Sequence, residues 1–341
     1  MDNYSYNQLL RSAISGEHLT RSQTRWAFGQ IMEGVWPDSQ IAGLLVAMAA
    51  KGHVADELAG AAEAMREHVI TIDNAGFDVI DTCGTGGSGV NSFNISTAAG
   101  LVAAGAGVKV AKHGNRTATR ASGSADALAE LGVNINAEPA VANRCLREAG
   151  VCFCFAIRCH PAMKYAAPVR KALGVRTIFN LIGPLTNPAM AKRQLMGVFA
   201  PGLTETIASV LGMLGSKRAI VVRAEDGLDE ISTASDTKMS HLRNGEVQTQ
   251  MFKPEDVGLP RAKLEDLLVT DARESARVIR NVLSGKKGPT RDIVLLNAAA
   301  ALSVATDAEI HQCLEQARES IDNQSALRAL ESLIELSNQP A

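Results

Sequence analysis

From Phe77 onward, short β-branched runs alternate with alanine-rich stretches of helical spacing. The strand-like runs are "FDVIDTCG", "VKVA", "VNIN", "VCFCFA", "RQLMGVF" and "RAIVVRA", and between them come "SADALAELG", "PAVANRCLREAG" and "TETIASVLGMLG". Such alternation is typical of an α/β fold with a mainly parallel sheet. The later segment "STASDTKMSHLRNGEVQTQMF" predicts strands joined by a hairpin at Asn244-Gly245, and the chain after Thr270 predicts helices.

The first seventy or so residues carry helix signals and no strand signals. Thr20 and Gln23 fit a capping box ahead of a helix, and a second helix fits between Asp38 and Gly52. The stretch "DELAGAAEAMREH" predicts a third. A chain of 341 residues with 46% hydrophobic content suits one large domain plus a smaller one. We therefore expect a small helical domain before the α/β domain.

Charge and cysteine content narrow the class of partner. The formal net charge is -2 with no block of Lys or Arg, which argues against a nucleic-acid or polybasic membrane surface. The polar N-terminus lacks signal-peptide order, and no apolar run is long enough to span a bilayer. The six cysteines suggest no disulfide framework. We expect a soluble, cytoplasmic protein with reduced thiols and a small-molecule ligand.

The stretch "DTCGTGGSGVNSFNIST" is suited to binding an anion, because glycine lets backbone N–H groups approach and point at a phosphate. Gly84, Gly86 and Gly89 match the dinucleotide fingerprint, but the next strand does not end in an acidic residue. A Walker loop would need lysine where Val90 stands. A longer cradle remains, which ends at a helix N-terminus in "NIST" and is large enough for a pyrophosphate.

A second polar loop, "KHGNRTATRASGSAD", also follows a strand and precedes a helix, which we expect to be capped by Ser122 or Ser124. Loops after adjacent parallel strands converge at the carboxyl edge of a sheet, so both loops could face one ligand. Its polyanion-binding candidates are Lys112, His113, Asn115, Arg116 and Arg120.

These segments resemble the anthranilate phosphoribosyltransferase family. The resemblance rests on "DTCGTGG", "FNISTAA", "KHGNR", "GSADALAELG", "HPAMKYAAPVRKALGVRTIFNLIGPLTNP" and "DGLDEIS", in the family's order and spacing. The helical opening is similar as well, so the match covers nearly the whole chain.

The resemblance implies a nucleoside phosphorylase/phosphoribosyltransferase-like fold, with a helical domain over 1–72, completed by about 165–188, and an α/β donor-binding domain over 73–341. It implies transfer of phosphoribosyl from 5-phosphoribosyl 1-pyrophosphate to anthranilate in tryptophan biosynthesis. It also implies two Mg²⁺ ions per active site, a homodimer formed through the helical domains and association with anthranilate synthase. No side chain is expected to act as an obligatory acid or base.

The resemblance also assigns residues. The donor would be bound by Gly84, Gly87, Ser88, Ser92, Asn94, Ile95, Ser96, Thr97, Lys112, His113, Gly114, Asn115 and Ser124. The acceptor anthranilate would be bound by Gly84, Asn115, His160 and Arg170. The metal ligands would be Ser96, Asp229 and Glu230.

The chemistry of these side chains agrees with the assignment. Departure of pyrophosphate leaves an oxocarbenium-like centre, so neutralising charge on the leaving group matters more than a strong base. Mg²⁺ prefers hard oxygen ligands, which Asp229 and Glu230 could supply, although acidic pairs in loops are usually just solvated. Arg170 suits a carboxylate because its planar fork can bind both oxygens.

Several positions depart from the family pattern or suggest other chemistry. Ser88 stands where the family has an acid, Thr117, Ala118, Thr119 and Arg120 stand where it tends to have serines, and Ile157 replaces a usual proline. Cys152, Cys154, Cys159 and His160 could suggest zinc, but "VCFCFA" predicts a buried strand and no paired C-x-x-C is present.

Two other function classes compete with the transferase. A pyrimidine nucleoside phosphorylase has a similar fold and glycine loop, but carries a Lys-His-Ser segment where this chain has "VIDTCG". A nucleic-acid-binding relative of the same fold should be basic and lack the glycine loop or the acidic pair. This chain is not basic and keeps both features.

Overall fold

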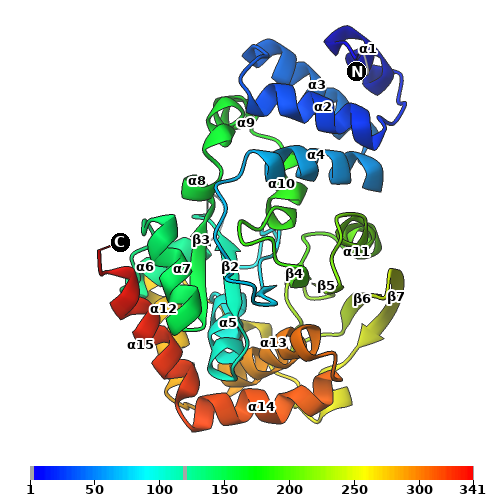
Figure 1. Cartoon of the computed structure of the whole chain (residues 1–341). Helices are drawn as coiled ribbons and strands as arrows, with labels where there is room; N and C mark the ends of the chain where they lie inside the picture. The colour runs from blue at the N-terminus through cyan, green and yellow to red at the C-terminus, as the bar shows by residue number, and fades with distance from the viewer. Residues whose placement is uncertain (1–3, 118–120, 341) are drawn as a thin grey trace.

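The computed structural model describes residues 4–117 and 121–340. Its N-terminal part is a group of helices at the top of Figure 1: α1 (Tyr6–Ile14), α2 (Arg21–Met32), α3 (Asp38–Lys51) and α4 (Ala55–Glu67). The predicted capping box is confirmed, because Thr20 and Gln23 exchange side-chain and backbone hydrogen bonds at the start of α2. Gly52 ends α3 at a φ of 81°.

A mixed sheet forms the centre of the molecule. In the described residues its strand order is β3-β2-β1-β4-β5-β6-β7. Strands β1 to β5 are parallel, whereas β6 and β7 pair in antiparallel fashion, so the predicted mainly parallel sheet and the hairpin at Asn244-Gly245 are confirmed. The strands are β1 (Ile80–Asp81), β2 (Val110–Gly114), β3 (Val151–Phe155), β4 (Arg193–Gly197), β5 (Arg218–Ala224), β6 (Thr237–Arg243) and β7 (Glu246–Phe252).

Helices cover both faces of the sheet (Figure 1). Alternation along β5 sends Ile220 and Val222 into the core with α5 and α13, and Ala219 and Val221 into the core with α11 and the N-terminal helices. The helices that accompany the sheet include α5 (Ile95–Gly105), α6 (Ser124–Leu131), α7 (Pro139–Glu148), α11 (Thr204–Met213), α12 (Ala272–Leu283), α13 (Pro289–Thr306), α14 (Ile310–Asp322) and α15 (Ser325–Ser337). No single helix in the described residues is long and apolar enough to cross a membrane; α13 and α14 qualify only as a pair bent by 114°.

The chain between β3 and β4 returns to the N-terminal helices. It forms α8 (Ala156–Cys159), α9 (Ala167–Leu173) and α10 (Phe179–Ile182), of which α9 packs on α3 and α10 on α4. The Phe28 ring lies 5.3 Å from that of Phe179. This connection therefore forms one wall above the carboxyl edge of the sheet.

Three local predictions were wrong. "VNIN" is a turn rather than a strand, because the Asn134 carboxamide oxygen accepts the Asn136 N–H (3.1 Å) and the backbone packs on α15. The second strand begins at Val110 and runs to Gly114, since Val108 still closes the end of α5. The N-cap of α6 is Gly123, not Ser122 or Ser124, because the Asp126 carboxylate accepts the Gly123 N–H at 3.1 Å.

Candidate active site

A cavity of about 770 Å³ opens at the carboxyl ends of β1, β2 and β4. The sheet extends from β1 to β2 and β3 on one side and to β4 and β5 on the other, which makes this edge a topological switch point where ligands bind in α/β sheets. Most of the predicted residues line this cavity: Gly84, Gly87, Ser92, Asn94, Ser96, Lys112, His113, Gly114, Asn115, Ser124, His160, Arg170, Asp229 and Glu230.

Within the described part of the chain, three residues that were predicted to bind the phosphoribosyl donor do not line the cavity. The side chains of Ile95 and Thr97 are buried in the core below the first turn of α5. Their N–H groups already donate to Phe93 O and Asn94 O. Ser88 is half-buried, and its Oγ accepts the Val90 N–H at 3.4 Å.

The base of the glycine loop is fixed to β4. Thr85 N–H donates to Gly197 O (2.9 Å), and Phe199 N–H donates to Thr85 Oγ1 (3.1 Å). A Cβ at Gly84 would lie 3.0 Å from Gly197 O, so the absence of a side chain lets the loop pack closely on β4. The loop therefore begins in a position set by main-chain contacts.

Lys112 connects the glycine loop to the start of α5. Its ammonium donates to Thr82 O (3.3 Å), Thr82 Oγ1 (3.2 Å) and Ser96 Oγ (3.3 Å), and the residue is only 4% exposed. A buried cation at a helix N-terminus, beside glycine N–H groups, is suited to a polyphosphate.

Asn94, the N-cap of α5, is held by residues from distant parts of the chain. Its Oδ1 accepts Ser122 Oγ (2.6 Å) and Ser275 Oγ (2.7 Å). Ser275 belongs to α12 and lies 181 residues away in sequence. Sequence reasoning missed its contribution, because no local pattern marks a contact at that separation.

The predicted acidic pair lies on the wall beside α5. Asp229 is 4% exposed, and Glu230 Oε1 accepts the Ser96 N–H at 3.3 Å. Asp229 packs so closely on β4 that a Cβ at Gly197 would overlap its carbonyl oxygen. Asp229, Glu230 and Ser96 thus present carboxylate and hydroxyl oxygens to one cavity, a donor set that fits Mg²⁺.

The opposite wall is more apolar and comes from the α8 to α10 connection. It includes Pro161, Met163, Phe179 and Pro184. The Arg170 guanidinium lies 5.3 Å from the centre of the Phe179 ring, and burial lowers the pKa of Arg170. This wall combines apolar side chains with the cationic side chains of Lys164, Arg170 and Arg176.

His113 and His160, which both line the cavity, contact each other. Their Nε2 atoms are 3.3 Å apart, and both residues are at most 5% exposed. Burial lowers the pKa of His160 to about 4, and burial together with His160 lowers the pKa of His113 well below its usual value. Both imidazoles are therefore neutral at pH 7.

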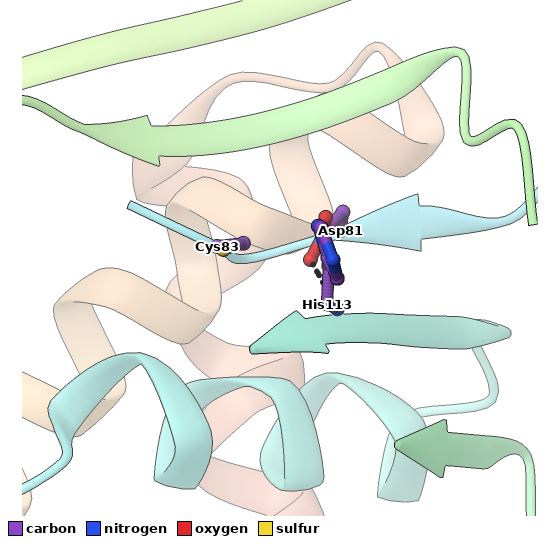
Figure 2. A group of neighbouring side chains, drawn as sticks. All are labelled: Asp81, Cys83 and His113. Atoms are coloured by element: carbon purple, nitrogen blue, oxygen red, sulfur yellow. Dashed lines mark hydrogen bonds between the residues drawn. The ribbon is translucent and has the colours of Figure 1, made fainter. Parts of the chain in front are cut away.

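Asp81, Cys83 and His113 form a compact group at the end of β1 and β2 (Figure 2). Their ligand-type atoms lie within 4.8 Å of one another. However, the Asp81 carboxylate already accepts His113 N–H (3.1 Å) and Asn187 Nδ2 (2.7 Å). Burial raises the pKa of the Cys83 thiol and raises that of Asp81 to about 6. The group's hydrogen bonds support the cavity floor from below.

The second polar loop is partly described. Arg116 pairs with Asp126 at 2.9 Å, and Ser124 Oγ donates to Asn115 O at 3.4 Å. Ala118, Thr119 and Arg120, named above as departures from the family pattern, lie outside the described residues.

The cysteines in β3 and just after it are enclosed in the core. Cys152 and Cys154 are fully buried, and burial raises the pKa of Cys159 to about 12. In residues 4–117 and 121–340, they do not form a metal-ligand group with His160.

Comparison with known proteins identifies relatives over nearly the whole chain. Residues 7–69 match the helical bundle domain of a glycosyl transferase family, and residues 76–327 match its a/b domain. The anthranilate phosphoribosyltransferase of Symbiobacterium thermophilum is 49% identical, over 97% of both chains. That of Moorella thermoacetica is 48% identical, over 95% of this chain and 96% of its own.

Solved structures agree. The anthranilate phosphoribosyltransferase of Thermus thermophilus matches with a TM-score of 0.92 and 39% identity, over 97% of this chain and 99% of its own. The enzyme from Saccharomyces cerevisiae in complex with PRPP and Mg matches with a TM-score of 0.89 and 27% identity, over 97% of each chain.

Proposed function

The chain belongs to the anthranilate phosphoribosyltransferase family, and we propose that the cavity at the carboxyl ends of β1 and β2 is its active site. The protein transfers the phosphoribosyl group of 5-phosphoribosyl 1-pyrophosphate to anthranilate, giving N-(5-phosphoribosyl)anthranilate and pyrophosphate, in L-tryptophan biosynthesis. The observation that carries the site assignment is the convergence of the glycine loop, the α5 N-terminus, Lys112 and the adjacent acidic pair at one cavity.

The donor occupies the sheet side of this site in our proposal. Backbone N–H groups of the glycine loop face its phosphates beside the N-terminus of α5, where the Lys112 ammonium also lies. Because these groups are fixed before the donor arrives, little reorganisation is needed as charge develops on the leaving pyrophosphate.

Mg²⁺ acts with the donor, and it supplies positive charge that stabilises the departing pyrophosphate. We propose that Ser96, Asp229 and Glu230 hold the metal, with two ions per site. The support is the donor set of hard oxygens on one wall, close enough for Glu230 to accept the Ser96 N–H.

Bond making at C1 needs positioning more than proton transfer. The C1–O bond to pyrophosphate breaks and the anthranilate nitrogen forms a bond to C1, after which the nitrogen gives its extra proton to water. The amine lone pair is available from the start, so we propose that no side chain acts as an obligatory acid or base.

Anthranilate would lie on the wall formed by the α8 to α10 connection. Arg170 faces its carboxylate, while Asn115, Gly84 and His160 lie at the same opening. Because His160 is neutral, a cation of this wall would have to select the carboxylate, and we propose Arg170, whose guanidinium lies against the Phe179 ring.

We further propose a helical domain over 1–72, completed by about 165–188, on an α/β domain over 73–341. We also propose a homodimer formed through the helical domains, which rests on the family alone. The six free thiols agree with a cytoplasmic location. Association with anthranilate synthase rests on the family alone.

The test is the loss of anthranilate fluorescence with the phosphoribosyl donor, in the presence and absence of Mg²⁺. Turnover that requires anthranilate, the phosphoribosyl donor and Mg²⁺ together supports the proposal. Phosphorolysis of a pyrimidine nucleoside without anthranilate turnover would instead favour the phosphorylase alternative.

A further inference from the structure

Arg176 reaches the tip of the glycine loop from the opposite wall of the cavity. It lies in the connection between α9 and α10, and its Nη2 donates to Gly87 O at 2.7 Å. Its guanidinium carbon also lies 4.3 Å from the centre of the Phe199 ring. Both Arg176 and Phe199 line the cavity, yet neither was among the residues predicted from the sequence.

The part of the loop that Arg176 contacts is otherwise open. Gly86, Gly87 and Gly89 have φ angles of 64°, 75° and 83°, so this stretch has the freedom of glycine. A Cβ built at Gly86 or Gly89 would meet no described atom within 4 Å. At Gly87 the nearest atom would be Arg176 Nη2, at 3.6 Å.

Phe199 links this contact to the fixed base of the loop. Its N–H donates to Thr85 Oγ1, and Thr85 is bonded to Gly197 O, so the ring belongs to the residue that anchors the loop start. Stacking on the Phe199 ring limits the positions that the Arg176 guanidinium can take. Because this guanidinium is charged, its hydrogen bond to Gly87 O is stronger than one from a neutral donor.

We propose that Arg176 is a positioning residue for the phosphoribosyl donor, which holds the Gly86-Gly87 turn in the conformation that binds phosphate. This rests on the proposed function of the cavity. Arg176 also connects the two walls of the cavity, because the segment that contains Arg170 on the anthranilate side also contains Arg176, which contacts the glycine loop.

The experiment compares Arg176→Ala, Arg176→Lys, Phe199→Leu and the double variant Arg176→Ala with Phe199→Leu against the wild type. Lys171→Ala, which removes an exposed cation from α9, is the control. Binding of 5-phosphoribosyl 1-pyrophosphate with Mg²⁺ is titrated in the absence of anthranilate, and KM is measured for both substrates. Thermal unfolding verifies that each variant is folded.

For Arg176→Ala we expect donor Kd and KM to rise about tenfold, the loss of one charged hydrogen bond, with anthranilate KM unchanged. Arg176→Lys should recover part of the loss, because lysine donates but lacks the planar stack. Phe199→Leu should add little once Arg176 is alanine, because the two side chains act as one unit.

Equal donor affinity in Arg176→Ala and the wild type would overturn the inference while leaving the function intact. Equal rises in both KM values, or full additivity with Phe199→Leu, would also overturn it. If the wild type neither binds the donor nor consumes anthranilate, the function itself fails and the inference with it.

Discussion

The two walls of the cavity are built differently. The donor wall, which we propose binds the phosphoribosyl donor, consists of the glycine loop, the start of α5 and Lys112. There Lys112 makes three hydrogen bonds to Thr82 and Ser96, and Asn94 is held by two serines from distant segments. The acceptor wall, which we propose binds anthranilate, is the α8 to α10 connection. There apolar side chains dominate and Arg170 lies against the Phe179 ring. A polyanion requires fixed donors and charge, whereas a planar aromatic acid requires flat apolar surface and one cation.

The largest expected effect tests the charge on the donor wall. Asp229→Asn combined with Glu230→Gln should keep the fold and reduce Mg²⁺-dependent turnover at least about a hundredfold, because each charged contact contributes roughly 1.5–3 kcal/mol. Turnover is measured across a magnesium titration, with Glu225→Gln, an exposed acid in the same loop, as the control. Unchanged titration curves would remove the pair from the metal site.

A pH experiment tests whether the buried pair of His113 and His160 is neutral. The pKa of His160 is about 4 in the folded protein and about 6.5 when unfolded, so between these values the unfolded chain binds more protons. The contribution of His160 to the free energy of unfolding should therefore fall on acidification, by about 2 kcal/mol between pH 7 and pH 5. His113 acts in the same direction, whereas Asp81, with a pKa raised to about 6, acts in the opposite one.

The measurement is thermal or urea unfolding at pH 7 and pH 5. His160→Gln should lose clearly less stability than the wild type on acidification, and His311→Gln, an exposed histidine of α14, should behave like the wild type. If His160→Gln loses as much as the wild type, the buried histidine is not the group responsible.

Arg170 tests the acceptor wall directly. Arg170→Ala should raise the KM for anthranilate about tenfold and leave the KM for the donor nearly unchanged, because it removes a contact to one substrate only. Steady-state kinetics with each substrate varied in turn provides the check. An equal rise for both substrates would place Arg170 outside the acceptor wall.

The donor wall was more predictable from sequence than the acceptor wall. Its residues follow β1 and β2 directly, and parallel strands bring such loops to one edge. The extent of β2 was predicted too short, so Lys112 and His113 proved to be strand residues. Alternation alone misled at "VNIN", where buried Val133 and Ile135 belong to a turn.

What the sequence could not supply were contacts between distant segments. The bond from Ser275 to Asn94, the pair of His113 with His160, and the contact of Arg176 with Gly87 join parts of the chain that no local pattern connects. Arg170 and the acidic pair were assigned by resemblance, since in isolation each is an ordinary surface pattern. The fold brings them to one cavity.

The smallest expected effect concerns Ser88, beside the tip of the glycine loop, where the family has an acid. A carboxylate there would repel the free polyanion but could attract Mg²⁺ or accept ribose hydroxyls, whereas serine keeps only hydrogen bonding. Ser88 is half-buried and off the cavity wall, so the change in donor binding should be on the order of 1 kcal/mol. Ser88→Asp should raise donor KM at low Mg²⁺ and recover as the metal increases, while the neutral Ser88→Asn should follow the wild type. If Ser88→Asp and Ser88→Asn give the same curves, the charge at this position does not influence the donor wall.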